Sequence, residues 1–497
     1  MNISGCAGLL RGLACVFAAF AGLSAAIAEA APRAAELGAE MRAAETAGGF
    51  VGKLSVTPRH APAGTPVAVS GEGLPPDHDF DLVWRTVKGR WKVTSAEYFG
   101  REFTPVAYRI VSVKSDKSGR IAASFVAPED FGFEHDIVVQ QGARLLTQTA
   151  FNLDMTVKLA ADTGPLGSPI SFEVKGIGWR ELEDSWVVLY DNKFTGFISV
   201  VTTGGTAHFT LPATGNVGLH IVEIQHSDFG SPYRNTQQSP VPDRPVFRLG
   251  FTVTSGAAVL PPPPEQQAQG RVRSLPPAGE LVATPPFAGV GQPVTVKGSG
   301  FEPGKSYKVH WATFVGNRMT GRGWDDVSRD LAEAKADAAG QVEFHFGMPD
   351  DLGGTHTVWV ATGAGDAKRT GSVWIAPTAL PLDVGRGPVG TTFRVHLKGV
   401  GWSETANIYT LVYDNATSGY ACAFNSQGDI EIIMPATGAP GWHFVDLYPA
   451  IYKGKETRPN NYRMPQLTYA DDHPGEDLPA FHFAFEITAE GRGPVGQ

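Results

Sequence analysis

The sequence predicts an all-β protein of four tandem β-sandwich domains, arranged as an a-b-a-b internal duplication. Three observations predict this fold class. The chain repeats itself over long spans, and short segments alternate apolar and polar residues at the period of a half-buried strand. Clusters drawn from the 59 glycines and 37 prolines recur about every eight to twelve residues, the turn spacing of a sandwich or barrel. We therefore expect many turns and few long helices in the 497 residues.

The clearest repeat relates two "b" units. The segment Lys175–Trp179 recurs as Lys398–Trp402, a shift of 402 − 179 = 223 positions. The same shift relates three further pairs: Tyr190-Asp191-Asn192 with Tyr413-Asp414-Asn415, Pro212–Gly215 with Pro435–Gly438, and His220 with His443. A constant shift over more than forty residues indicates a duplicated domain.

A second repeat relates two "a" units at a different shift. Thr57-Pro58 recurs as Thr284-Pro285 and Trp84 recurs as Trp311, a shift of 311 − 84 = 227. The two repeats predict domain 1 (54–153), domain 2 (154–254), domain 3 (281–376) and domain 4 (377–488, with a long F–G loop). The rest is assigned to a signal peptide (1–30), a flexible N-terminal segment (31–53), a Pro-rich semi-rigid linker (255–280) and a C-terminal tail (489–497).

The strands show the expected alternation in segments such as 66–70, 293–297 and 393–398. Within the domains, only 325–338 favours a short helix.

The N-terminus has the order of a secretory signal peptide. Arg11 precedes an apolar run over 13–28, and small residues follow at Ala28 and Ala30. A membrane anchor stays open as an alternative, although the run is short for a span of about 20 residues. The mature chain is therefore expected to be exported, to the periplasm or the cell surface, without a transmembrane segment.

Domains 1 and 3 share a more specific pattern. Pro58, Gly64, Pro66-Val67, Gly71 and Gly73 have counterparts over 285–301. This pattern resembles the opening strands of bacterial immunoglobulin-like domains of the IPT/TIG type, and 349–358 resembles their E–F turn and F strand. Domains 2 and 4 resemble immunoglobulin-like sandwiches only in general. The resemblance implies a binding or spacing role and supplies no catalytic residues.

The composition disfavours several classes of function. With 41 basic and 50 acidic residues, the net charge of −9 argues against nucleic acid as a partner. The common hydrolase, zinc-protease and phosphate-loop motifs are absent from the sequence. A non-enzymatic protein without cofactor or metal is favoured, although glycosidase carboxylates need no fixed spacing and an enzymatic activity stays open.

Two apparent signatures have simpler interpretations. The run 385–390 fits G-x-G-x-x-G, but a strand rather than a helix is expected after it. The acidic run 77–81 is interpreted as a solvated loop because its copy in domain 3 contains lysines, and weak calcium binding stays open.

The long F–G loop of domain 4 is the best candidate for a binding site. Aromatic rings beside arginine and carboxylates suit a sugar ring or a partner protein. The candidate residues are Tyr448, Tyr452, Arg458, Tyr462, Arg463, Tyr469, Asp472 and His473. Alternatively, the loop folds over the edge of a sheet and its tyrosines form a small core.

The repeated Tyr190-Asp191-Asn192 and Tyr413-Asp414-Asn415 have two interpretations. Asp and Asn tolerate left-handed geometry and bond their own backbone, which favours a tight turn. Ligand or cation binding by these residues is the alternative. His220 and His443 are interpreted as hydrogen-bonded strand residues rather than metal ligands.

The sequence thus favours an exported, non-enzymatic binding, adhesion or scaffolding protein of the cell envelope, whose partner is a protein or a glycan. The alternative is a carbohydrate-binding or carbohydrate-active protein that uses the aromatic loop of domain 4.

Overall fold

The structure is a computed structural model. It describes residues 49–94, 97–184, 186–227, 230–239, 243–267, 279–317, 323–362, 368–452 and 463–489. The predicted signal peptide, most of the N-terminal segment, part of the linker and nearly all of the tail lie outside these residues.

Each of the four domains consists of a three-stranded and a five-stranded sheet. Domain 1 contains β1 (Lys53–Thr57), β2 (His60–Ala61), β3 (Pro66–Glu72), β4 (Asp79–Thr94), β5 (Glu97–Lys114), β6 (Ile121–Val126), β7 (Phe133–Gln141) and β8 (Arg144–Leu153). Domain 2 contains β9 (Thr156–Leu159), β10 (Thr163–Pro165), β11 (Pro169–Lys175), β12 (Trp186–Tyr190), β13 (Lys193–Ile198), β14 (Ala207–Pro212), β15 (Gly218–His226), the 3-10 helix η1 (Thr236–Gln238) and β16 (Val246–Thr254).

The second half repeats this order. Domain 3 contains β17 (Leu281–Thr284), β18 (Phe287–Ala288), β19 (Pro293–Gly298), β20 (Ser306–Asn317), β21 (Gly323–Lys335), β22 (Val342–Gly347), β23 (Gly354–Ala361) and β24 (Lys368–Ile375). Domain 4 contains β25 (Thr378–Leu380), β26 (Arg386–Pro388), β27 (Thr392–Lys398), β28 (Ile408–Tyr413), β29 (Ala416–Cys422), the 3-10 helix η3 (Phe424–Ser426), β30 (Ile430–Pro435), β31 (Gly441–Ala450) and β32 (Phe481–Thr488).

The sheet topology is immunoglobulin-like. In domain 1 the orders β1-β3-β6 and β2-β8-β7-β4-β5 correspond to strands A-B-E and A′-G-F-C-C′, and the same orders recur in domains 2, 3 and 4. The short A′ strand pairs in parallel with the last strand of its domain, as β2 does with β8. The predicted fold class is confirmed.

The predicted helix at 325–338 is wrong. Most of this segment belongs to β21, which pairs with β20 from Ser306↔Lys335 to Asn317↔Gly323. Its alanines, single glutamate and lysine favour a helix only weakly, and long pairing with a neighbouring strand overrides that preference.

A large aromatic residue lies at the centre of each core on strand C. Trp84, Trp186, Trp311 and Tyr409 are fully buried and occupy equivalent positions in the duplication. Each of the four domains is therefore built around one large aromatic side chain on this strand.

Within each half, the a and b domains join through the same contact. Gly132 N donates to Ile177 O at 3.0 Å, and Gly353 N donates to Val400 O at 2.9 Å. A Cβ atom at Gly132 would lie 1.7 Å from the carbonyl oxygen of Gly176, so only glycine allows this approach. The repeated Lys-Gly-x-Gly-Trp segment thus forms the seam of the a–b pair.

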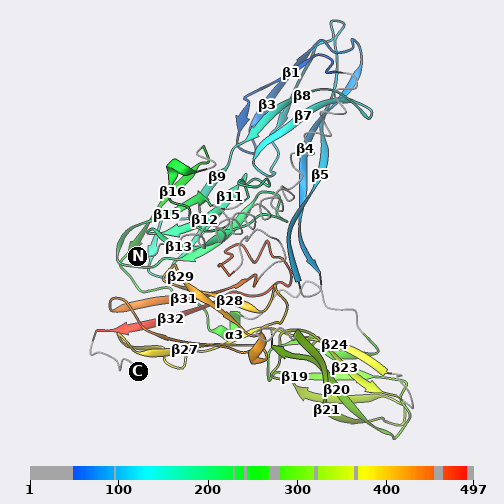
Figure 1. Cartoon of the computed structure of the whole chain (residues 1–497), viewed down its shortest axis with the longest axis vertical. Helices are drawn as coiled ribbons and strands as arrows, with labels where there is room; N and C mark the ends of the chain where they lie inside the picture. The colour runs from blue at the N-terminus through cyan, green and yellow to red at the C-terminus, as the bar shows by residue number, and fades with distance from the viewer. Residues whose placement is uncertain are drawn as a thin grey trace, which may run out of the picture.

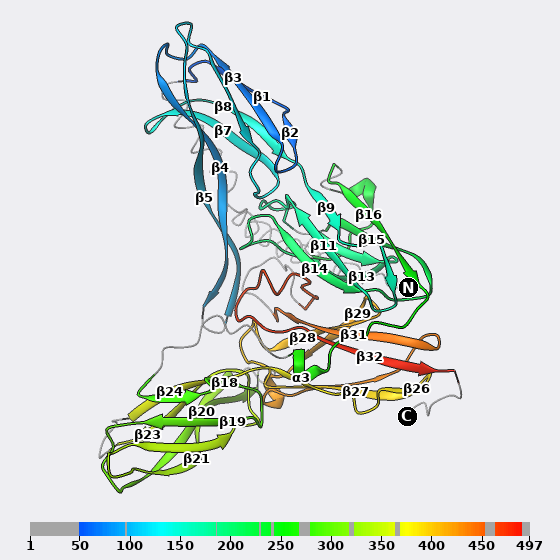
Figure 2. The ribbon, with the colours of Figure 1, turned by 180° about the vertical axis from the view of Figure 1, so that it is seen from behind.

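The two halves pack against each other and do not form an extended string (Figures 1 and 2). Val412 and Tyr448 of domain 4 belong to the apolar cluster that contains the core of domain 2. Between the halves, the linker helix α3 (Pro264–Gln267) contacts β32. There, Gln267 Nε2 donates to His482 O at 2.8 Å and His482 N donates to Gln267 Oε1 at 2.7 Å.

Candidate functional site

The loop between β31 and β32 is the predicted binding loop, and the structure distributes its residues between the interior and the surface. Of the eight predicted residues, Tyr448 was wrongly placed in the loop, because it lies on strand β31, where it pairs with Thr410 of β28, and it is buried. Tyr469 and Asp472 are buried within the loop, and Tyr452, Arg463 and His473 are accessible. Arg458 and Tyr462 lie outside the described residues. The loop therefore has an inner and an outer part.

Asp472 lies where domains 1, 2 and 4 meet. Its Oδ1 accepts hydrogen bonds from Trp91 Nε1 at 2.8 Å, Thr202 N at 2.9 Å and Thr202 Oγ1 at 2.8 Å. Its Oδ2 accepts one from Val201 N at 2.8 Å. A carboxylate with 0% exposure needs such donors to offset its lost hydration. We call Asp472, Trp91, Val201 and Thr202 the Asp472 junction.

The same loop covers the free edge of domain 2. Phe197 N on β13 donates to Pro465 O at 2.9 Å, and Leu467 N donates to Phe197 O at 2.9 Å. Gln466 is fully buried and its Nε2 donates to Ser199 Oγ at 2.9 Å. An open sheet edge exposes unpaired backbone groups, and this loop satisfies part of that edge. Residues 465–467 thus fold over a sheet edge.

The β4–β5 hairpin is an arm that leaves domain 1 and runs beside domain 2 to domain 4 (Figure 1). Tyr98, which is 2% exposed, donates its backbone N–H to Glu404 Oε2 at 2.9 Å. Gly89 lies against domain 2, where a Cβ atom would come within 2.0 Å of Val201 O. The arm therefore contacts both b domains.

Ionisable groups are buried where the arm meets domain 2. Arg101 Nη1 lies 2.7 Å from Asp184 Oδ2. Burial raises the pKa of Asp184 to about 6, although the Arg101 charge opposes this shift. Burial and the Arg244 charge lower the pKa of His226 to about 4. Where the arm meets domain 2, the Arg101 guanidinium is thus paired with the Asp184 carboxylate.

Tyr469 lies in a small core between domains 3 and 4. It packs with Trp374, Ala406 and Leu478, and its hydroxyl donates to Glu476 O at 2.9 Å. Burial raises the pKa of Glu476 to about 7. The inner part of the loop therefore joins domains.

The outer part of the loop contributes to an aromatic and cationic cluster. The guanidinium carbon of Arg463 lies 5.2 Å from the ring centroids of both Tyr420 and Tyr452. Tyr420 is 45% exposed. We call these three residues the surface cluster. Sequence analysis missed Tyr420 because it lies on β29, thirty or more positions before the loop, and only the sheet register brings it close.

The two Tyr-Asp-Asn segments form the two-residue turns of the hairpins β12–β13 and β28–β29. Asp191 and Asn192 have φ of 48° and 64°, and Asp414 and Asn415 have φ of 46° and 59°. In each copy the aspartate bonds the strand histidine, Asp191 Oδ2 to His220 Nδ1 at 2.6 Å and Asp414 Oδ2 to His443 Nδ1 at 2.5 Å. The other nitrogen of each histidine faces a backbone carbonyl.

The tyrosines of these segments also have internal partners. Tyr190 Oη donates to Thr214 O at 2.8 Å, and Tyr413 Oη donates to Thr437 O at 2.8 Å. Each turn therefore meets the 212–215 or 435–438 segment of its own domain, which gives these residues a structural role.

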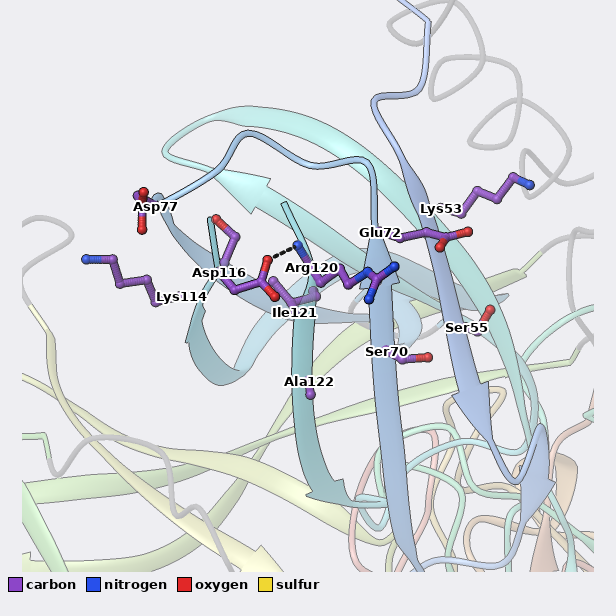
Figure 3. Close-up of a pocket in the computed structure, with 12 residues that line it drawn as sticks. Lys53, Ser55, Ser70, Glu72, Asp77, Lys114, Asp116, Arg120, Ile121 and Ala122 are labelled. Carbon is purple, nitrogen blue, oxygen red and sulfur yellow. Dashed lines mark hydrogen bonds between the residues drawn. The ribbon is translucent and has the colours of Figure 1, made fainter. Parts of the chain in front are cut away.

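A shallow depression of about 840 Å³ lies on the outer side of domain 1, beside the acidic run 77–81. Figure 3 shows Asp77 and Lys114 at one side of it and Lys53 pointing away at the other. The Asp116 carboxylate is bonded by the Ser118 hydroxyl and the backbone of Arg120, which lowers its pKa. No group of three or more potential metal ligands occurs within the described part of the chain.

Comparisons with known proteins give only distant likenesses. No family model matches the chain. No curated protein matches it either. The ICAM-5 D1–D4 ectodomain fragment is 12% identical over 84% of this chain and 99% of that chain, with a TM-score of 0.17. Invasin, a bacterial integrin-binding protein, is 10% identical over 87% of this chain and 78% of that chain, also with a TM-score of 0.17.

A third solved structure, from a 1.5-MDa bacterial ice-binding adhesin, is 13% identical over 65% of this chain and 96% of that chain, with a TM-score of 0.13. Scores this low mean that the whole chains do not superpose, so the fold assignment rests on the sheet topology above. Among the described residues, no helix has the length and apolarity needed to span a membrane.

Proposed function

We propose that this chain is an exported, non-enzymatic binding, adhesion or scaffolding protein of the cell envelope. The observation that carries this proposal is the Asp472 junction, where one buried carboxylate bonds donors from domains 1 and 2 and holds them against domain 4. A frame fixed in this way presents its surfaces in one arrangement. Partners then bind with less loss of conformational entropy than they would on a flexible string of domains.

We further propose that domains 1 and 3 are of the IPT/TIG type. Of the glycines in the shared pattern, Gly64 lies just before β3, Gly71 lies on it and Gly73 follows it directly. The proposal adds a binding or spacing role for the two domains that lie outside the domain 2–domain 4 contact.

The test is a saturable interaction with an envelope component. The full mature chain is immobilised and exposed to cross-linked cell-envelope extract, with a heat-unfolded sample of the same chain as control. The proposal predicts a partner enriched by the folded chain and competed by free folded chain. A contradictory result is turnover of an envelope polymer by the purified chain that is lost on one carboxylate substitution.

A second candidate function is carbohydrate binding at the surface cluster. Tyr420, Tyr452 and Arg463 combine exposed aromatic surface with a cation in a geometry that suits stacking on a sugar ring. A glycan array with the full chain tests this candidate. Tyr420→Ala is expected to weaken any specific glycan signal at least about tenfold, because stacking surface is lost.

The matched control for that array is Tyr108→Ala, which removes a similarly exposed tyrosine from the arm of domain 1. Equal loss of signal in both variants, or no signal with the wild type, contradicts carbohydrate binding at this cluster. Either result leaves the envelope-partner proposal to its own test.

A further inference from the structure

Domain 2 exposes an apolar sheet face whose counterpart in domain 4 is buried at Phe444 and half-buried at Trp442. Val217, Leu219 and Ile221 are 69%, 67% and 39% exposed, and we call them the exposed face. Leu219 and Ile221 lie on β15, where they alternate with the buried His220 and Val222, and Val217 directly precedes the strand. The shift of 223 places Trp442 and Phe444 at the positions of Leu219 and Ile221, and Phe444 is only 3% exposed.

The structure shows what covers this face in domain 4. The Phe444 ring lies over Gly167, where a Cβ atom would come within 2.6 Å of Phe444 Cζ. Beside it, Asn415 Nδ2 donates to Pro212 O at 2.8 Å and to Thr214 Oγ1 at 3.0 Å. The face of domain 4 is therefore covered by a corner of domain 2 that is built from two turns.

The equivalent corner of domain 4 is present but uncovered. The shift of 223 places Val389, Pro435 and Thr437 at the positions of Leu166, Pro212 and Thr214. Val389 is 42% exposed, and Pro435 and Thr437 are exposed, whereas Thr214 in the covered corner is 1% exposed. We call these three residues the domain 4 corner.

The residue that bonds the corner is duplicated as well. Asn192 is the counterpart of Asn415; it is exposed, whereas Asn415 is fully buried. One molecule therefore carries both halves of a second contact of the same kind, the exposed face on domain 2 and the domain 4 corner. Their exposure shows that they do not meet within the chain.

Local charge does not oppose the meeting of two such surfaces. Glu223, next to the exposed face, is paired with Arg234 at 3.1 Å and with Arg248 at 2.7 Å. Strands β26 and β32 lie beside the domain 4 corner. Among their described residues, the only ion pair joins Arg386 and Glu486 at 3.5 Å.

We propose that the exposed face of domain 2 binds the domain 4 corner of a second copy of this chain, head to tail. The contact is not a full repeat of the one between domains 2 and 4, because Met464 of the domain 4 loop already packs on the β12–β13 part of the same sheet. It involves the uncovered β15–β16 part. A head-to-tail contact joins different surfaces, so it adds copies in a closed ring or in an open series, depending on the rotation between them. The inference does not rest on the proposed function.

The experiment is sedimentation velocity on the full mature chain over a concentration series. Wild type is expected to form oligomers whose proportion rises with protein concentration. Ile221→Glu on the face and Thr437→Arg on the corner each place a charge in the contact and are expected to raise the apparent dissociation constant roughly tenfold or more. Both positions are on the surface, and melting curves equal to wild type show that each variant folds.

The mixture of the two variants is the decisive sample. Each variant alone is expected to be monomeric, whereas an equimolar mixture still has one intact face and one intact corner and is expected to form a 1:1 dimer and nothing larger. Val327→Glu, on the exposed β21 strand of domain 3, is the matched control and should assemble like wild type. A monomeric wild type, assembly that both variants leave unchanged, or a mixture that forms no dimer overturns the proposal.

Discussion

The two a domains carry the same C–C′ hairpin and use it differently. In domain 1 the β4–β5 arm passes between the other domains, and Trp91 bonds Asp472 there. In domain 3 the β20–β21 hairpin exposes Val315 and Val327 at 46% and 38%. Duplication therefore reproduces the fold of the hairpin. The contacts that each hairpin makes depend on the residues of the other domains beside it.

The residues that surround the two hairpins differ in two ways that can be traced in the sequence. Position 318, which is 91 + 227, holds arginine where the first arm has Trp91. The domain 4 loop that provides Asp472 is also longer than its domain 2 counterpart, since β31 and β32 are separated by 451–480 and β15 and β16 by 227–245. If these two differences hold the arm of domain 1 in place, changes in that arm should cost more stability than the matched changes in domain 3.

Gly89→Val should have the largest effect. The new Cβ would lie 2.0 Å from Val201 O, so the arm must leave domain 2. We expect a loss of about 3–5 kcal/mol in unfolding free energy, or an undocked arm that proteases cleave rapidly. Gly316→Val (89 + 227) is the matched change in the exposed hairpin, and equal damage from both would contradict the contrast between the arms.

Asp472→Ala should follow. It removes the acceptor of the buried Val201 N–H and of the partly buried N–H groups of Trp91 and Thr202, at a cost of about 3 kcal/mol. Asp472→Asn keeps an acceptor oxygen and should cost less. Hydrogen exchange at Val201 and Thr202 is the measurement, and unchanged protection in Asp472→Ala would mean that the junction does not depend on this carboxylate.

Glu476→Gln should change the pH dependence of stability. Burial raises the Glu476 pKa from 4.5 to about 7, so the folded state holds a proton that the unfolded state has lost, and stability falls as the pH rises from 4.5 through 7. The variant should melt like wild type at pH 4 and be more stable at pH 8, by about 2–3 kcal/mol at most. Parallel melting curves across this range would contradict the buried state of Glu476.

Trp91→Phe should have the smallest effect of the series. It removes one hydrogen bond to Asp472 while keeping aromatic packing on Tyr98, at 6.1 Å between ring centroids, and should cost about 1 kcal/mol. Trp359→Phe is the control, because its indole bonds Ser328 on the exposed part of domain 3. A larger loss of unfolding free energy in Trp359→Phe than in Trp91→Phe would contradict the prediction.

The sequence was sufficient for the fold because strand alternation and the repeats are local signals. Gly132 and Gly353 have the same seam role because the pair repeats as a whole. The helix at 325–338 was wrong because composition does not reveal that the segment pairs with β20.

The candidate site was predictable only in part. The long loop was visible as an insertion, and Tyr452 and Arg463 are accessible as a ligand site requires. The junction role of Asp472 depends on Trp91, which is 381 positions away, and no spacing in one sequence connects two such residues. Tyr420 joins the surface cluster for the same non-local reason.

The central claim is that the arm of domain 1 is held against domain 4. It can be tested by the distance between two spin labels on a chain of residues 31–497, one on the exposed native Cys422 of domain 4 and one on the arm as Lys92→Cys. The account predicts a single narrow distance distribution in wild type that broadens when Asp472→Ala is added. A broad distribution in wild type, unchanged by Asp472→Ala, would contradict it.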